Sequence, residues 1–164
     1  DHRQSADGPG DGCRYASGLG YRVSLREGFL SGDAAARGKS LAQELLQGPP
    51  GIVIWGGETT VALPPNPGQG GRNQHLALAA ARELAAAQDC YLLAAGTDGS
   101  DGPTEDAGAV VDGGTVARAA LHGETPERAI ANADSGRFLE ASGDLISTGP
   151  TGTNVMDLVI GLRV

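Results

Sequence analysis

Polar, glycine-rich segments that directly follow apolar runs constrain the fold of this chain most. The runs 51–55 and 90–95 are continuously apolar, which is typical of strands buried on both faces of a sheet. Residues 31–47 carry the apolar stripe of a helix capped by Ser31, and residues 72–88 form a long segment rich in Ala and Leu. Because strands and helices alternate, the sequence predicts an α/β layered domain with a mixed, largely parallel sheet and helices packed on it.

Shorter patterns complete the expected order of elements. Further strands are predicted over residues 20–25, 59–63, 107–111, 145–147 and 155–162, and helices over residues 115–121, 126–132 and 137–141. Residues 1–18 are expected to be a mobile tail or the remnant of a linker, and residues 19–164 to form the domain. Since the chain does not start with Met, we expect it to be a fragment or a processed product.

The composition excludes several classes of protein. The chain of 164 residues has a net charge of -8, which argues against nucleic acid as a partner because phosphate binding needs a basic surface. No apolar run approaches the roughly 18 residues of a membrane span, so no membrane association is expected. The two cysteines, Cys13 and Cys90, form neither a disulfide framework nor a metal-binding pair, which favours the cytoplasm.

Much of the glycine, 27 residues in all, lies in four polar segments that follow predicted strands. These segments are residues 56–60, 68–74, 96–104 and 148–154. Since ligands of open α/β sheets bind beyond the carboxyl ends of strands, we expect the segments to share one site for an anion or a nucleotide. The predicted ligand-binding residues are Gly56, Gly57, Glu58, Thr59, Gly70, Gly71, Asn73, Gln74, Thr97, Gly99, Thr148, Gly149, Thr151, Gly152, Thr153 and Asn154.

Arg72 is the first candidate for a catalytic role. It opens a predicted helix directly after Gly70 and Gly71, where free backbone N–H groups and the helix dipole favour an anion. A cation at this position opposes the dipole, and a bound phosphate would resolve the conflict. A solvated arginine at a helix start is the alternative. Glu58 could pair with Arg72 or bind a metal.

Asp98 and Asp101 are the candidate metal ligands. Carboxylates flanked by glycine suit Mg²⁺, which takes one or two carboxylates together with phosphate oxygens and waters. One of them, with Asp98 as our catalytic candidate, could instead accept a proton from a substrate hydroxyl. Equally, aspartates in glycine-rich turns often hydrogen-bond their own backbone. His75 is expected to lie behind the site or on the surface.

Two nucleotide-binding motifs are missing. Gly38-Lys39-Ser40 resembles the end of a phosphate-binding P-loop, but the first glycine of that motif is replaced by Asp33 and the segment has a helical pattern. No Gly-x-Gly-x-x-Gly follows a predicted strand, which counts against an NAD-dependent activity.

Four ordered motifs together resemble the C-terminal MOFRL domain of type-2 glycerate kinases, many of which also carry the name hydroxypyruvate reductase. These motifs are GGETTV (56–61), GGRNQ (70–74), GTDGSDGPT (96–104) and TGPTGTNVMDL (148–158). The resemblance extends from about Gly20 to the end of the chain. His75 and Met156 depart from it, since the family usually has Glu and a polar residue at these positions.

The resemblance implies a kinase that uses ATP and Mg²⁺ to phosphorylate D-glycerate, normally to 2-phosphoglycerate. It implies a cleft between this domain and a larger N-terminal α/β domain, which is absent from the chain and would supply a catalytic Lys. It places Arg72 on phosphate or substrate, and Asp98 and Asp101 near the metal. The isolated fragment is expected to be inactive. A homodimer is left open, and the rivals are an NAD(P)H-dependent hydroxypyruvate reductase and a non-catalytic module that binds a metabolite or a partner.

Overall fold

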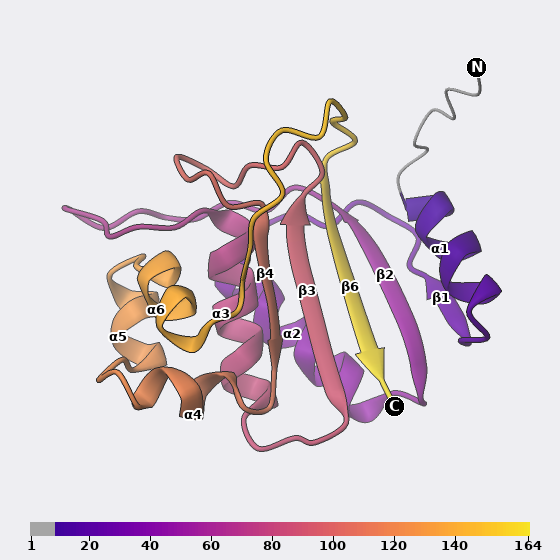
Figure 1. The fold of residues 1–164 in the computed structure, drawn as a ribbon, viewed down its shortest axis with the longest axis horizontal. Coiled ribbons are helices and arrows are strands. Elements are labelled where there is room, and N and C mark those ends of the chain that lie inside the picture. Colours follow the sequence, from indigo (N-terminus) through magenta and orange to yellow (C-terminus); the bar gives the residue numbers. More distant parts are fainter. Residues whose placement is uncertain (1–8) are drawn as a thin grey trace.

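A computed structural model describes residues 9–164, which form one six-stranded mixed sheet in the order β1-β2-β6-β3-β4-β5 (Figure 1). The strands are β1 (Val23–Leu25), β2 (Gly51–Gly57), β3 (Cys90–Gly96), β4 (Gly108–Asp112), β5 (Leu145–Ile146) and β6 (Asp157–Arg163). The predicted α/β class with a mixed sheet is confirmed. The expectation that the sheet is largely parallel is wrong, because only β1 and β2 pair in parallel and the other four pairs are antiparallel.

The position of β6 explains this difference. β2 and β3 run in the same direction and are joined through a helix, as in a parallel sheet, but β6 lies between them and is antiparallel to both. Gly57 at the end of β2 and Gly96 at the end of β3 therefore both pair with Asp157 at the start of β6. The segments that follow β2 and β3 still leave the sheet at one edge, beside the segment that leads into β6.

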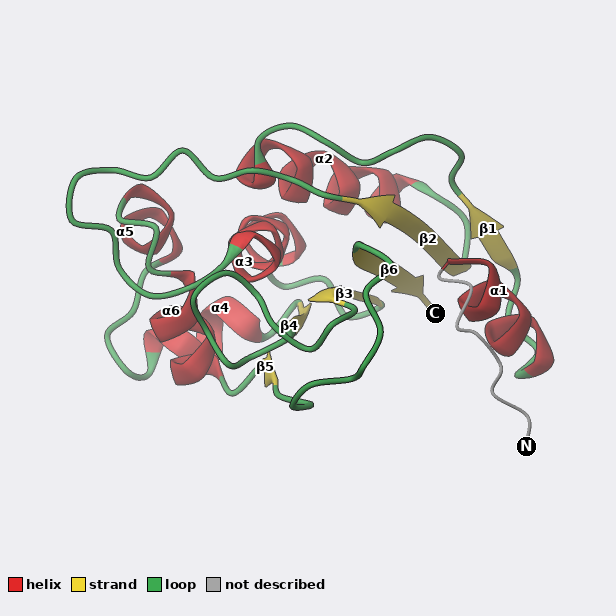
Figure 2. Ribbon diagram, turned by 90° about the horizontal axis from the view of Figure 1, so that it is seen from above, coloured by secondary structure: helices red, strands yellow, loops and turns green. Residues whose placement is uncertain are grey.

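Helices cover the sheet unequally (Figure 2). α2 (Ala34–Gln47) and α3 (Arg72–Leu84) lie on one face, and α1 (Pro9–Gly18) contacts β1 and β2 from the other side. The short helices α4 (Thr115–Ala120), α5 (Pro126–Ala131) and α6 (Ser135–Ser142) gather beside α3. Where the sequence predicts a tail over residues 1–18, residues 9–18 form α1, while residues 1–8 lie outside the described residues.

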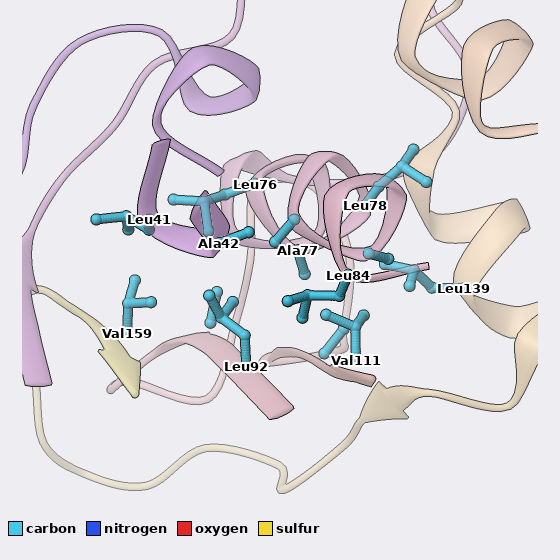
Figure 3. Packing of buried hydrophobic residues seen from close by; sticks show 14 of the residues in the cluster. Leu41, Ala42, Leu76, Ala77, Leu78, Leu84, Leu92, Val111, Leu139 and Val159 are labelled. Carbon is cyan, nitrogen blue, oxygen red and sulfur yellow. The ribbon is translucent and has the colours of Figure 1, made fainter. Parts of the chain in front are cut away.

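The core is built around α3, whose Leu and Ala side chains are buried between α2, the sheet and the short helices (Figure 3). Gly38 on α2 faces the backbone carbonyl of Leu76, and a Cβ at this position would overlap it. The two helices can therefore approach this closely only because residue 38 is glycine. Gly38-Lys39-Ser40 lies within α2, as its helical pattern predicts, and has no phosphate-binding geometry.

Two local predictions need correction. Asp33, whose side chain accepts a hydrogen bond from the Ala36 N–H at 2.9 Å, caps α2 in place of Ser31. Residues 59–63 do not form a strand, since only Thr60 makes an isolated bridge to Asp33. This bridge holds the segment after β2 against the start of α2, and that segment can therefore line a cavity rather than extend the sheet.

Candidate functional site

Arg72, the first residue of α3, is held by two carboxylates. Its Nε lies 2.5 Å from Asp157 Oδ2 and its Nη2 lies 3.0 Å from Oδ1, and its Nη1 lies 3.2 Å from Glu58 Oε1. The hydrogen bond to Asp157 is the main reason that the pKa of Arg72 is raised above its ordinary value. The Asp157 side chain is only 7 % exposed and that of Glu58 is 55 % exposed. Asp157 therefore fixes the plane of the guanidinium, while Glu58 makes a solvent-accessible contact.

Asp101 is the anion at the start of α3. Its Oδ1 accepts hydrogen bonds from the backbone N–H and side-chain amide of Asn73 at 2.9 and 3.2 Å, and its Oδ2 accepts from the Gln74 N–H at 2.8 Å. The residue is 1 % exposed, and this burial raises the pKa of its carboxyl group. The conflict between Arg72 and the helix dipole is thus resolved within the chain, and the N–H groups of Asn73 and Gln74 are not open to a ligand.

The capping role of Asp101 also explains Gly71. A Cβ at this position would overlap the carboxylate and backbone of Asp101. Both carboxylate oxygens of Asp101 are engaged, so the geometry supports a structural role over metal ligation. Asn73 and Gln74 are likewise buried, and Gln74 Nε2 donates to Thr104 Oγ1 at 2.9 Å, which ties the segment after β3 to α3.

Asp98 occupies a different environment. It is half-buried, and its Oδ1 accepts hydrogen bonds from the Ser100 N–H at 2.9 Å and the Ser100 hydroxyl at 3.1 Å. These hydrogen bonds, the backbone one first, lower the pKa of Asp98 and keep its carboxyl group ionised. Part of the expected turn-forming role is therefore present, but the carboxylate still faces a cavity.

The segments after β3 and before β6 are hydrogen-bonded to each other. Thr151 Oγ1 donates to the Thr97 carbonyl at 2.5 Å, and the Thr151 N–H donates to the Asp98 carbonyl at 3.2 Å. Thr97 Oγ1 in turn donates to the Met156 carbonyl at 2.7 Å and accepts from the Val155 N–H at 2.9 Å. Thr97 and Thr151 thus serve mainly to lock these two segments together.

Two adjoining cavities share Glu58 and Arg72. The larger, of about 430 Å³, is lined by Glu58, Thr59, Thr60, Val61, Leu63, Pro67, Gly68, Gly70, Gly71, Arg72, His75, Gly102, Pro103, Ala133 and Ser135. The smaller, of about 150 Å³, is lined by Glu58, Arg72, Thr97, Asp98, Asn154, Met156 and Asp157. The remaining predicted site residues line neither cavity; they are Gly56, Gly57, Asn73, Gln74, Gly99, Asp101, Thr148, Gly149, Thr151, Gly152 and Thr153.

Among the lining residues with ionisable side chains, His75 and Asp157 are the two that the sequence-based candidates did not include. His75 is 5 % exposed and lines the larger cavity, and its Nδ1 is buried without a hydrogen-bond partner among the described residues. A surface position for His75 is therefore excluded. The sequence did contain a signal for this position: His75 is three residues from Arg72 on one helix, and residues at this spacing share a face. Asp157 belongs to the last motif (148–158), but nothing in that motif indicates that Asp157 pairs with Arg72.

Acid is expected to lower the free energy of unfolding through His75. Burial lowers the pKa of His75 below its ordinary value of 6.5, against an opposing effect of Asp33, so below that pH the unfolded chain binds a proton that the folded chain does not. Stability attributable to this group therefore falls as the pH drops below the unfolded pKa. Urea unfolding at about pH 7.5 and about pH 5.5 should show a smaller fall for His75→Gln than for the wild type. Equal falls would contradict this assignment, and the exposed His122, as His122→Gln, is the matched control.

Two features are absent from the described part of the chain. Within residues 9–164, no group of three or more His, Cys, Asp or Glu side chains is arranged to hold a metal ion. In the same part of the chain, no helix has the length and apolar character needed to cross a membrane.

Comparison with known proteins gives consistent matches. The MOFRL family model matches residues 51–157. D-glycerate 2-kinase of Thermotoga maritima is 52% identical over 115 residues, which cover 70% of this chain and 27% of that protein. Glycerate 2-kinase of Pyrococcus horikoshii is 37% identical over 158 residues, which cover 92% of this chain and 36% of that protein.

A solved structure matches in three dimensions as well. The crystal structure of glycerate kinase from Thermotoga maritima superimposes with a TM-score of 0.90 at 40% sequence identity. The match covers 94% of this chain and 39% of that one. The chain thus spans only 27% to 36% of the length of the curated relatives described above.

Proposed function

Since the chain belongs to the MOFRL family, we propose that it is the C-terminal domain of a glycerate kinase. In this proposal the enzyme transfers the γ-phosphoryl group of ATP to D-glycerate, giving 2-phosphoglycerate, and the domain forms one wall of an interdomain cleft. The observation that carries the proposal is the position of Arg72 on the border of the two cavities, oriented by Asp157. We further propose a cytoplasmic location for this reaction.

Arg72 would stabilise the phosphoryl group in transit. The transition state of phosphoryl transfer spreads charge over three equatorial oxygens, so its stabilisation depends on positioned cations more than on covalent chemistry. Asp157 occupies Nε and Nη2, which fixes the guanidinium without a cost in orientation when the substrate arrives. Among the described residues, Nη1 contacts only the exposed Glu58 carboxylate, and a phosphate oxygen can replace that contact.

Asp98 is the residue of this domain that fits a Mg²⁺ ion. Its carboxylate is ionised, lies in the smaller cavity with Arg72 and keeps lone pairs beyond those used by Ser100. Asp101, with both oxygens engaged by α3, does not fit that role and serves to position Arg72. When bound, Mg²⁺ would neutralise charge on the phosphate oxygens.

The rest of the enzyme would supply the groups that this domain lacks. The matched segments make up 27% and 36% of the two relatives, which leaves room for the N-terminal α/β domain and its catalytic Lys. We therefore propose that the isolated 164-residue chain binds ligand weakly and does not catalyse the reaction. The N-terminal domain is its expected partner.

The proposal is tested by following two reactions of the full-length protein in parallel. ATP-dependent conversion of D-glycerate to 2-phosphoglycerate, detected by mass spectrometry of the product, is the expected result. Oxidation of NADH in the presence of hydroxypyruvate, without phosphorylation of glycerate, would favour the reductase instead. If neither reaction occurs and calorimetry detects no binding of Mg-ATP or glycerate, a non-catalytic module becomes the better explanation.

A further inference from the structure

The larger cavity contains an unused hydrogen-bonding group. His75 is almost completely buried, and its Nδ1 has no partner among residues 9–164. A buried polar atom without a partner is rare in folded proteins and calls for an explanation. The imidazole also forms part of the cavity wall. Nδ1 is shielded within that wall, so the ring nitrogen that a ligand in the cavity can reach is Nε2, which likewise has no hydrogen-bond partner among the described residues.

The two cavities differ in chemical character. Glu58, Asp98, Asp157 and Arg72 dominate the smaller one, which is charged and only about 150 Å³ in volume. Val61, Leu63, Pro67, Pro103 and Ala133 give the larger one extensive apolar walls over about 430 Å³, which is in the range of cavities that hold drug-sized molecules.

His75 in its neutral form suits a neutral ligand. The uncharged imidazole offers one donor and one acceptor and brings no positive charge to attract an acid group. The apolar walls are suited to the faces of a flat ring. Arg72, three residues before His75 on the same face of α3, stands where this cavity meets the smaller one.

We propose that the larger cavity takes the nucleoside part of the phosphoryl donor and that His75 forms a hydrogen bond with its base. The phosphate groups would then extend past Arg72 toward the smaller cavity. This inference rests on the proposed kinase function and adds which cavity holds the base and which residue of this domain recognises it.

The test compares two ligands that share a diphosphate and differ in the nucleoside. Isothermal titration of the full-length protein with Mg-ADP and with Mg-pyrophosphate gives both dissociation constants without turnover. In His75→Leu we expect the Kd for ADP to rise about tenfold, the value of one lost hydrogen bond, and the Kd for pyrophosphate to stay within about twofold. His75→Gln, which keeps a donor and an acceptor, should restore ADP binding to within about threefold of the wild type.

Several outcomes would overturn the inference. If the binding of ADP and that of pyrophosphate weaken equally, His75 supports the fold of the site and does not contact the base. If the KM for D-glycerate rises while the Kd for ADP is unchanged, the larger cavity binds D-glycerate instead of the nucleoside. No change in any constant would leave His75 outside the site. His122→Leu, at an exposed histidine, is the matched control and should leave all constants unchanged. A wild type that binds ADP but does not phosphorylate glycerate would refute the proposed function and leave this inference standing.

Discussion

Replacing Arg72 by alanine is expected to lower the turnover of the full-length enzyme, under the kinase function proposed above, at least about 100-fold, the effect typical of removing one preorganised transition-state donor. The guanidinium stands on the border of both cavities, and Asp157 holds it in a single plane. Arg72→Lys should recover little activity, because an ammonium group cannot keep the paired contact with Asp157 and reach a phosphate oxygen at the same time. Steady-state kinetics with saturating ATP and D-glycerate measures the effect.

The design of this experiment must separate catalysis from folding. Arg82, which lies on the same helix with a side chain 52% exposed and pairs with Glu127, provides the control variant Arg82→Ala. We expect Arg82→Ala to be within about twofold of the wild type, as for an exposed ion pair of little energetic weight. Wild-type turnover in Arg72→Ala would remove Arg72 from the mechanism. If turnover is lost and the circular dichroism spectrum also loses its helical signal, Arg72 is needed for folding and not specifically for catalysis.

Asp101→Ala is expected to reduce the free energy of unfolding by about 2–3 kcal/mol and activity at least about tenfold. The substitution leaves three donors of α3 without their acceptor in a buried site, so the start of the helix that carries Arg72 loses its anchor. Urea unfolding and steady-state kinetics of the same preparations measure the two effects. Glu105→Ala, at an exposed carboxylate in the same segment, should change neither.

Asp98→Ala and Asp101→Ala are expected to differ in their response to magnesium. If Asp98 contributes to metal binding, raising the Mg²⁺ concentration should restore part of the activity of Asp98→Ala, and its stability should stay close to that of the wild type. Asp101→Ala should not respond to Mg²⁺, because its defect lies in the helix start. A stable Asp101→Ala enzyme whose activity returns at high Mg²⁺ would overturn the capping role and reinstate Asp101 as a metal ligand.

The fold could be predicted from sequence as far as local patterns reach. The runs at β2 and β3 and the helical segments at α2 and α3 were recognisable because apolar periodicity depends on neighbouring residues. The order of the strands could not be predicted in this way. The apolar pattern of β6 would be the same at a sheet edge, in a parallel pair or, as found, between two antiparallel neighbours. The error about strand direction follows from that missing long-range information.

At the candidate site, too, local features could be predicted from sequence and long-range contacts could not. Arg72 and its contact with Glu58 were among the predicted possibilities, and Asp98, a predicted metal ligand, lines a cavity together with Arg72. Asp157 escaped notice because its approach to Arg72 depends on β6 pairing with both β2 and β3. Asp98 and Asp101 look alike in a glycine-rich segment, and only the start of α3 determines which of them turns inward.

The central place of β6 also has a consequence for synthesis of the chain. β6 is the last strand of this domain to be made, yet it joins β2 to β3 and so unites the two parts of the sheet (Figure 1). Before it emerges from the ribosome, β1–β2 and β3–β4–β5 have no hydrogen bonds to each other, and such long-range pairing is slow. Asp157 opens this strand, so Arg72 acquires its orientation only when the sheet closes, and a nascent or truncated chain carries an arginine that is not yet aligned.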